Sequence, residues 1–386
     1  MQQEFRLYDA DAHVMLSPRM WETLPEKYVP RRPRPVQVSD GADMGHWTTG
    51  WSIEGRIEPH PFGPGAQPAN TPSVVLEGFG NLPPGLQTLI GERPPIGSMD
   101  LSEPAVRLRD LDRLGIDIQM LFPSTLYAHM TTDPGFEAAL YRSYNRYMGR
   151  QCREHPQRLK WAGLLPLQDT RQACEAAGEM ADLGASAAVV YGTAGERLLS
   201  HPGFTAAWDE FAKTRLPLCV HMGMSYPPFQ QLCESIFDAH VLGMCLPAML
   251  GMIALVGHGI LDRYPDLKVA FLEFGAEWIL YMVARMDHYL PGDKGRKMPF
   301  RDRLPRERIE HYAKSGRIFI GVEGEDALIE QEMELMGEGQ LLYSSDFPHP
   351  ESRENAAQQI LQRKDLSPGQ KEKLFYDNAV GLFGAP

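Results

Sequence analysis

The segment YDADAHVM, residues 8–15, has the apolar surroundings of a β-strand and carries Asp9, Asp11 and His13. Alternate side chains of a strand point to the same face, so these three residues are expected to share one side. A carboxylate and an imidazole two residues apart can bind one cation. They can equally form an ion pair at a strand end that does no chemistry, and the rest of the sequence has to decide.

This strand is the first of eight short apolar runs that alternate with amphipathic segments. The expected strands cover residues 5–11, 116–122, 160–167, 186–192, 216–222, 267–274, 317–322 and 340–347. The expected helices cover residues 104–114, 134–153, 171–183, 204–214, 277–289, 306–315 and 326–336. Continuously apolar strands are typical of parallel sheets covered on both faces. The sequence therefore predicts an α/β protein, a (β/α)8 TIM barrel, rather than a dinucleotide-binding fold, whose glycine-rich loop is missing after the first strand.

Residues 29–100 interrupt this alternation with many prolines and glycines. We expect a single barrel domain over residues 1–386, with 29–100 an irregular insertion after the first strand. Aromatic residues such as Trp47 favour an insertion that folds over the barrel mouth as a lid or a partner arm. A flexible linker is the alternative.

Composition narrows the class of partners. The formal net charge of −12 over 386 residues argues against nucleic acid and anionic membranes as partners. The apolar segment 240–261 is interrupted by histidines, proline and glycines, so a buried or subunit-facing helix is expected instead of a membrane span. Five scattered cysteines and the absence of a secretory pattern predict reduced thiols in a cytoplasmic protein and no cysteine metal site.

Ionisable residues stand where four of the predicted strands end. They are Asp11 and His13 on the first strand, His221 on the fifth, Glu273 on the sixth, and Asp346 with His349 after the eighth. The carboxyl ends of barrel strands meet at one rim, where catalytic groups lie. Burying these groups together without a cation would cost several kcal/mol each, so a divalent metal site is predicted.

Five motifs, DADAH, RLRDLDRLGIDIQMLFPS, VHMG, GILDRYPDLKVAFLEFGAEW and SSDFPHPE, resemble in their order the signatures of the amidohydrolase-2 family. This family belongs to the amidohydrolase superfamily and includes the amino-carboxymuconate-semialdehyde decarboxylase-like enzymes. The resemblance implies one divalent metal at the barrel mouth, most often Zn²⁺, with Asp11, His13, His221 and Asp346 as ligands. Asp11 replaces the first histidine of the commoner His-x-His pair, which keeps Mn²⁺ and Fe²⁺ open.

Glu273 departs from the histidine that the decarboxylase members carry after the sixth strand. It could bind the metal, transfer protons, or hold a neighbour by an ion pair. His349 is expected to orient Asp346, and both Asp346 and Glu273 are candidate acid–base groups.

Three residues are candidate substrate contacts by position alone: Trp47, Ser124 and Tyr127. Arg107, in the helix before the second strand, is expected to form ion pairs with Asp110 or Asp112.

The first functional hypothesis is hydrolysis of an amide, ester or lactone of a small molecule by a metal-activated water. The first alternative is non-oxidative decarboxylation of an aromatic or muconate-type acid. Further alternatives are cyclisation, dehydration or hydration on the same scaffold, and a barrel that only binds or scaffolds. The apolar segment 232–261 is expected to form a homodimer contact.

Overall fold

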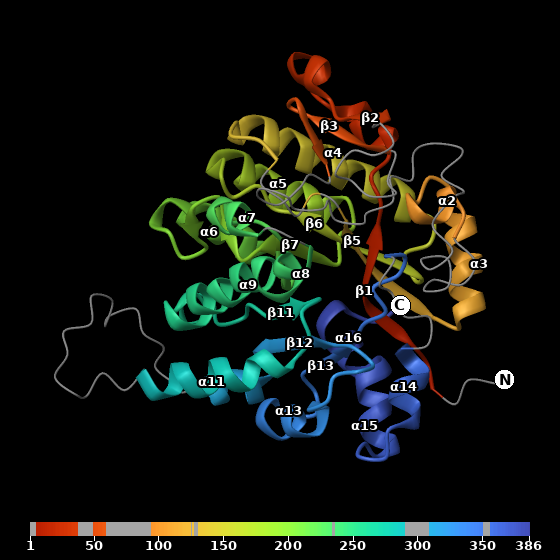
Figure 1. Ribbon diagram of the computed structural model, residues 1–386, viewed down its shortest axis with the longest axis vertical. Coiled ribbons are helices and arrows are strands. Elements are labelled where there is room, and N and C mark those ends of the chain that lie inside the picture. The colour runs from red at the N-terminus through yellow and green to blue at the C-terminus, as the bar shows by residue number, and fades with distance from the viewer. Residues whose placement is uncertain are drawn as a thin grey trace.

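The computed structural model describes residues 5–37, 49–58, 94–124, 126, 130–233, 236–289, 309–349 and 356–386. Its main sheet has eight strands, and every described pair between neighbouring strands is parallel. The strands follow one another in the order of the chain, and helices flank the sheet on its outer side (Figure 1). The predicted (β/α)8 barrel is therefore confirmed.

All eight predicted strands are present. They are β1 (Tyr8–Val14), β5 (Ile118–Pro123), β6 (Leu159–Leu164), β7 (Ala187–Tyr191), β10 (Leu218–His221), β11 (Val269–Leu272), β12 (Ile318–Val322) and β13 (Leu341–Tyr343). Nearly all of their side chains are buried, as expected for strands packed between a barrel interior and outer helices.

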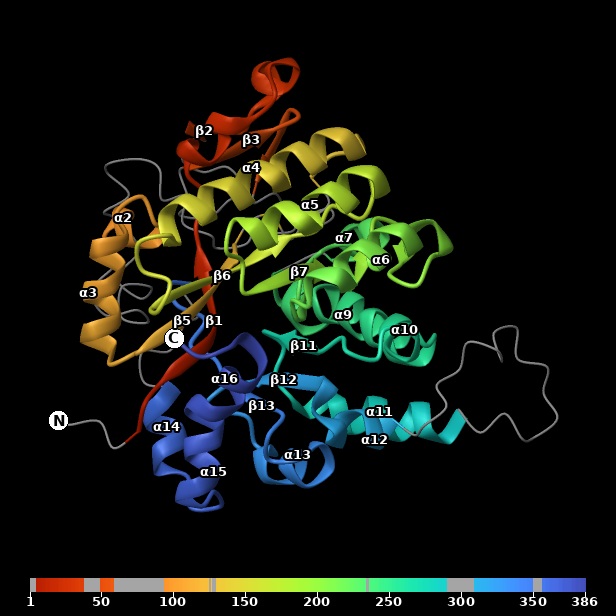
Figure 2. The same ribbon diagram turned by 180° about the vertical axis from the view of Figure 1, so that it is seen from behind.

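The outer layer consists of helices between consecutive strands, seen from both sides in Figures 1 and 2. The longer helices are α3 (Pro104–Leu114), α4 (Pro134–Cys152), α5 (Thr170–Asp182), α6 (Thr205–Thr214), α9 (Cys245–Met252), α11 (Glu277–Tyr289) and α13 (Ile329–Met336). The shorter helices are α2 (Ile96–Met99), α7 (Pro227–Leu232), α8 (Ile236–Asp238), α10 (Ile260–Arg263), α12 (Ile309–Tyr312), α14 (Ala356–Gln362), α15 (Pro368–Glu372) and α16 (Asn378–Phe383).

Helix ends follow local sequence signals. Helix α3 has Pro104 in its first turn and ends at Gly115, whose φ of 74° suits a residue without Cβ. Helix α4 begins at Asp133, whose carboxylate accepts hydrogen bonds from the backbone amides of Gly135 and Phe136.

The barrel closes between β1 and β13, the two ends of the sheet order. The amide of Asp346 donates to the carbonyl of Asp11 at 3.0 Å, and the amide of His13 donates to the carbonyl of Phe347 at 2.7 Å. The chain leaves β13 after Tyr343 to make these bonds, so the eighth strand is shorter than the predicted run 340–347.

One prediction about β1 is wrong. The register of β1 against β5 shifts between Asp9 and Ala12, which interrupts the alternation of side chains. Asp9 therefore does not share a face with Asp11 and His13. Its carboxylate instead accepts hydrogen bonds from the side chains of Gln119 and Ser345, at 2.7 and 2.6 Å.

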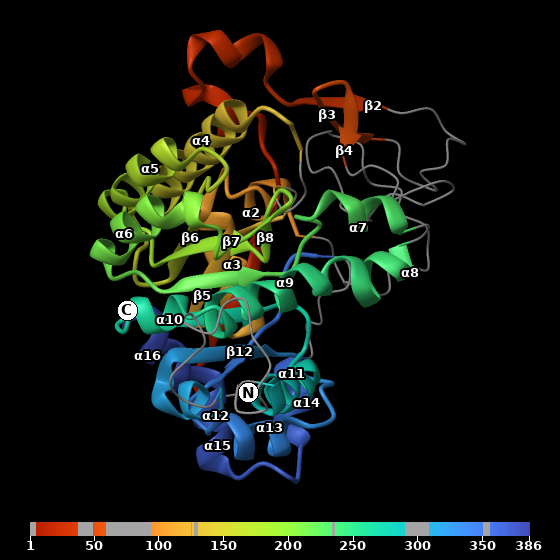
Figure 3. The same ribbon diagram turned by 90° about the vertical axis from the view of Figure 1, so that its left-hand side faces the viewer.

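The described part of the insertion contains a small antiparallel sheet, made of β2 (Arg34–Gln37), β3 (Thr49–Ile53) and β4 (Arg56–Glu58). It stands outside the ring of parallel strands (Figure 3). Trp51 and Ile53 are buried in the hydrophobic core, so this part of the segment is not a free linker. A hairpin of β8 (Thr193–Ala194) and β9 (Arg197–Leu198) follows β7.

The apolar segment forms a helix over Ala239–Gly257 that combines α9 with π-helical turns at both ends. Its 19 residues and mean hydropathy of 2.0 would suffice to span a membrane, but 56% of its most apolar stretch is buried inside the protein. Core helices of soluble proteins pass the same test, so this is weak evidence for a membrane. Leu232, Phe237, Val241 and Leu242 are exposed at and before its start, and a homodimer contact through them stays a prediction.

Candidate metal centre

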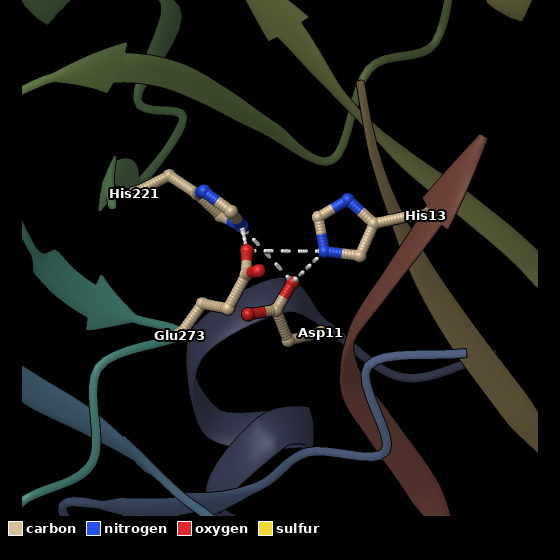
Figure 4. A group of neighbouring side chains, drawn as sticks. All are labelled: Asp11, His13, His221 and Glu273. Atoms are coloured by element: carbon tan, nitrogen blue, oxygen red, sulfur yellow. Dashed lines mark ion pairs between the residues drawn. The ribbon is translucent and has the colours of Figure 1, made fainter. Parts of the chain in front are cut away.

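Four ionisable side chains from three strands meet at the barrel mouth. Asp11 and His13 come from β1, His221 is the last residue of β10, and Glu273 follows β11 directly. Figure 4 shows their polar ends directed toward a common point. One donor atom from each residue lies within 4.8 Å of the others.

Glu273 is central to this group. Its Oε2 lies 2.7 Å from His221 Nε2 and 3.2 Å from His13 Nε2 (Figure 4). Asp11 Oδ1 lies 3.4 Å from His221 Nε2 and 3.6 Å from His13 Nε2. Donor atoms of two imidazoles and two carboxylates thus lie close enough together to bind one metal ion.

A second, overlapping group contains His13, Glu273, Asp346 and His349. Asp346 Oδ1 lies 3.2 Å from His13 Nε2 and 2.8 Å from His349 Nδ1. The four residues predicted as ligands are therefore close together, but Asp346 belongs to the second group and is connected to Asp11 and His221 through His13.

Many polar atoms of these groups are buried and lack hydrogen-bond partners among the described residues. They are both oxygens of Asp11, both ring nitrogens of His13, Nε2 of His221, Oδ1 of Asp346 and Nδ1 of His349. Leaving one such atom unpaired costs about 1–3 kcal/mol, and more when it is charged. A cation would offer a partner to one atom of each residue, so the donors fit a divalent metal with nitrogen and oxygen ligands such as zinc, manganese or iron.

The orientation of His221 supports the same interpretation. Its Nδ1 lies 2.9 Å from the carbonyl oxygen of Met222, a contact in which Nδ1 carries the proton. Nε2 then faces the group, and it can bind a metal once it has lost its proton.

Without a cation, protons balance the charge of the group. Burial alone would lower the pKa of His221, but the carboxylates of Glu273 and Asp11 raise it well above its ordinary value. Burial alone would raise the pKa of Glu273, but His221 and His13 hold it well below its ordinary value. A metal ion would replace the histidine protons, because a ligating imidazole must be neutral on the binding nitrogen.

His349 and Ser124 extend the group. The rings of His349 and His13 stack with centroids 3.9 Å apart, and His349 Nε2 lies 3.0 Å from Ser124 Oγ. His349 thus lies between Asp346 and Ser124, where it can orient the carboxylate as the sequence predicts. Trp47 and Tyr127, the other predicted substrate contacts, lie outside the described residues.

The structure has a pocket that the sequence did not predict, at the same end of the barrel as the candidate metal centre. Its lining includes Glu137 and Tyr141 of α4, Gln168 after β6, and Tyr191 at the end of β7. The Gln168 amide donates to the buried Glu137 carboxylate at 2.7 Å, and the Tyr191 ring lies edge-on to His221 at 6.4 Å. Glu137 and Gln168 belong to no recognisable sequence motif. They meet only because the fold brings α4 beside the end of β6.

Arg107 also differs from its prediction. It is completely buried and donates to the side chain of Gln119, whereas Asp110 pairs with Arg113 and Asp112 pairs with Arg158. The expected ion pair with Asp110 or Asp112 is therefore not formed.

Two curated proteins are similar to this chain in sequence. A 2-amino-3-carboxymuconate-6-semialdehyde decarboxylase of Dictyostelium discoideum is 22% identical over 73% of this chain and 77% of its own length. A gamma-resorcylate decarboxylase of Polaromonas is 22% identical over 74% of this chain and 88% of its own.

Solved structures match nearly the whole chain. An amidohydrolase of Mycobacterium avium subsp. paratuberculosis aligns with a TM-score of 0.74 and 19% identity, covering 100% of this chain and 99% of that one. A 5-carboxyvanillate decarboxylase of Novosphingobium aromaticivorans, solved with manganese and 4-hydroxy-3-methoxy-5-nitrobenzoic acid, aligns with a TM-score of 0.70 and 19% identity over 99% and 97% of the two chains. The amidohydrolase family model matches residues 8–385, and the chain belongs to this family.

Proposed function

We propose that this protein is a metal-dependent, non-oxidative decarboxylase of a small aromatic or unsaturated carboxylic acid. The observation that carries the proposal is the Asp346–His349 pair, 2.8 Å apart, beside a buried group of ligands suited to a divalent cation. Three of the four similar proteins named above are decarboxylases of such acids, which supports this reaction over the hydrolysis favoured by the sequence alone.

Asp11, His13, His221 and Asp346 would hold the metal, with Zn²⁺ as the first candidate and Mn²⁺ or Fe²⁺ as alternatives. A divalent cation at this position would supply a positive charge that holds the carboxylate or a neighbouring oxygen of the substrate.

The protein's own side chains would supply a proton at a defined position. Decarboxylation breaks the bond between the substrate carbon and its carboxylate, releases CO2, and requires one proton at that carbon. Asp346 would deliver this proton and recover it from His349, which contacts both Asp346 and Ser124. The substrate carboxylate and one proton thus yield CO2 and the hydrogen-substituted product, without any oxidant.

The test uses protein loaded with Zn²⁺ or Mn²⁺ and a panel of hydroxybenzoates, including 2,6-dihydroxybenzoate and 5-carboxyvanillate, in D2O. We expect CO2 release and one deuterium at the carbon that carried the carboxylate. Asp346→Asn should lose turnover, and Arg317→Met, remote from the centre, should keep it. Products of ester or lactone hydrolysis from a parallel panel, with no CO2 from any acid, would contradict the proposal.

Hydrolysis is the second candidate because of one specific observation. Glu273 places a carboxylate, instead of a histidine, within 2.7 Å of His221. A carboxylate there can accept a proton from water, which suits attack on an amide, ester or lactone. Hydrolytic turnover that falls in Glu273→Gln would favour this candidate, whereas a protein that binds neither zinc nor manganese would favour a scaffold.

A further inference from the structure

A buried polar network lies behind the candidate centre, on the side of helix α3. Arg107 is 0% exposed, and its guanidinium donates through Nε to the side-chain oxygen of Gln119 at 2.8 Å. Nη2 donates to the carbonyl of His13 at 3.1 Å and lies 3.4 Å from the carbonyl of Phe347. The guanidinium also lies over the Phe347 ring, 4.5 Å from its centroid.

Asp9 forms the other end of the network. It is also 0% exposed, and its Oδ2 accepts hydrogen bonds from the Gln119 amide at 2.7 Å and the Ser345 hydroxyl at 2.6 Å. Its Oδ1 accepts from the backbone amide of Ser345 at 3.0 Å. The Gln119 amide thus connects a buried cation to a buried anion.

Both ends of the network hold the segments that carry candidate ligands. Arg107 binds the carbonyl of His13 on one segment and of Phe347 on the other, while Asp9 binds Ser345, the neighbour of Asp346. These segments meet where β1 and β13 close the barrel. Two backbone hydrogen bonds cross this seam in place of a regular ladder, so the side-chain bonds of Arg107 and Asp9 add to what holds the two segments together.

Burying two charged side chains in a core costs free energy of hydration, which apolar residues of similar volume would not lose. Their geometry is specific instead. Each hydrogen bond of the Arg107 guanidinium reaches a different element, and the planar fork fixes the relative positions of its acceptors. Such a network is suited to setting distances in the structure.

We propose that Arg107 and Asp9 are positioning residues of the metal centre. They set the separation between Asp11 and His13 on one side of the barrel seam and Asp346 on the other. This inference rests on the proposed metal site and is independent of the reaction that the site performs.

The test measures Mn²⁺ affinity by chelator competition in Asp9→Asn, Arg107→Lys and Arg107→Met, together with the Mn²⁺ electron paramagnetic resonance spectrum. We expect affinity to fall about 10- to 100-fold in Asp9→Asn and Arg107→Met, as for other groups that orient ligands, with a smaller loss in Arg107→Lys. The spectrum should change because the ligand geometry changes. Melting temperatures measured in parallel report any general loss of stability.

Arg317→Met is the matched control. Arg317 also donates to backbone carbonyls, those of Leu261 and Tyr264, but at the start of β12. The Arg317→Met protein should be less stable than wild type, and its Mn²⁺ affinity should stay within about twofold of wild type. If an Arg107 variant does not fold, Ser345→Ala replaces it in the test, because this substitution removes one hydrogen bond to Asp9.

Two failures are distinguishable. Unchanged affinity and spectrum in folded Asp9→Asn and Arg107→Lys, with wild type binding Mn²⁺, would overturn the positioning role and leave the metal centre intact. Wild-type protein that binds neither Mn²⁺ nor Zn²⁺ would overturn the proposed function and this inference together.

Discussion

Replacing Glu332 by glutamine should make the protein more resistant to alkaline pH. Glu332 lies on α13 and is 0% exposed, and both of its carboxylate oxygens lack hydrogen-bond partners among the described residues. Burial raises its pKa to about 8, and the nearby Asp326 and Glu277 carboxylates add to this effect against the opposing charge of Arg363. The carboxyl group is therefore neutral in the folded protein at neutral pH.

The direction of the pH effect on stability follows from proton binding by the folded and unfolded states. The folded state keeps the Glu332 proton up to a pH of about 8, whereas the unfolded chain loses it near 4.5. The stability that this group contributes is thus fully present below pH 4.5 and is lost as the pH rises through 8. At 1.36 kcal/mol for each pH unit, the interval corresponds to about 5 kcal/mol of unfolding free energy. Rearrangement of the surrounding side chains around the ionised carboxylate reduces this penalty, so we expect roughly 2–3 kcal/mol.

The assay compares urea unfolding of wild type, Glu332→Gln and Glu334→Gln at several pH values between 5 and 9. Glu334 is an exposed neighbour on the same helix, and its replacement should follow wild type at every pH. Glu332→Gln should start near or slightly below wild type at pH 5, because its amide is also buried, and then gain relative to wild type as the pH rises. Parallel curves for all three proteins would refute the reasoning.

The remaining predictions concern the metal centre. His221→Ala should lose bound metal, whereas Asp346→Asn should retain more metal by elemental analysis and still lose turnover; full activity in Asp346→Asn would exclude it as the proton donor. Chelation should lower the melting temperature, and metal restored to about 100 times its dissociation constant should return roughly 2.7 kcal/mol of stability. Glu273→Gln should fold normally and turn over more slowly, and an unchanged pH–rate profile would argue against proton transfer by Glu273. Glu273→Gly should be about 1 kcal/mol more stable than Glu273→Ala in urea unfolding, and equal stabilities would contradict the backbone strain inferred below.

The sequence predicted the elements well because their signals are local. Helices α3 and α11 begin and end at the predicted residues, since proline, glycine and apolar spacing mark them directly. The strand predicted at 340–347 was too long because β13 ends where the chain turns to bond β1, a contact between residues more than 300 positions apart. Such a contact leaves no trace in the local pattern.

The candidate site was predictable in outline for a topological reason. In a parallel barrel, the carboxyl ends of all strands lie at the same rim, so Asp11, His221 and Glu273 could be placed together without coordinates. Asp9 could not be placed correctly, because the register shift in β1 depends on pairing with β5. The expected ion pairs of Arg107 with Asp110 or Asp112 failed for a similar reason: the barrel seam brings backbone carbonyls beside its guanidinium.

The backbone at two carboxylates shows what the site requires of the fold. Glu273 and Asp346 have φ values of 68° and 57°, in the left-handed region that side chains with a Cβ occupy at a cost of roughly 1–2 kcal/mol. Glycine avoids most of this cost, which is why it should exceed alanine in stability at position 273, the reverse of the order inside regular structure. Both residues follow the ends of their strands, where an extended backbone would carry the chain away from the barrel mouth. The left-handed turn instead brings both carboxylates within 3.2 Å of His13 Nε2, so the strain is the local condition for their meeting.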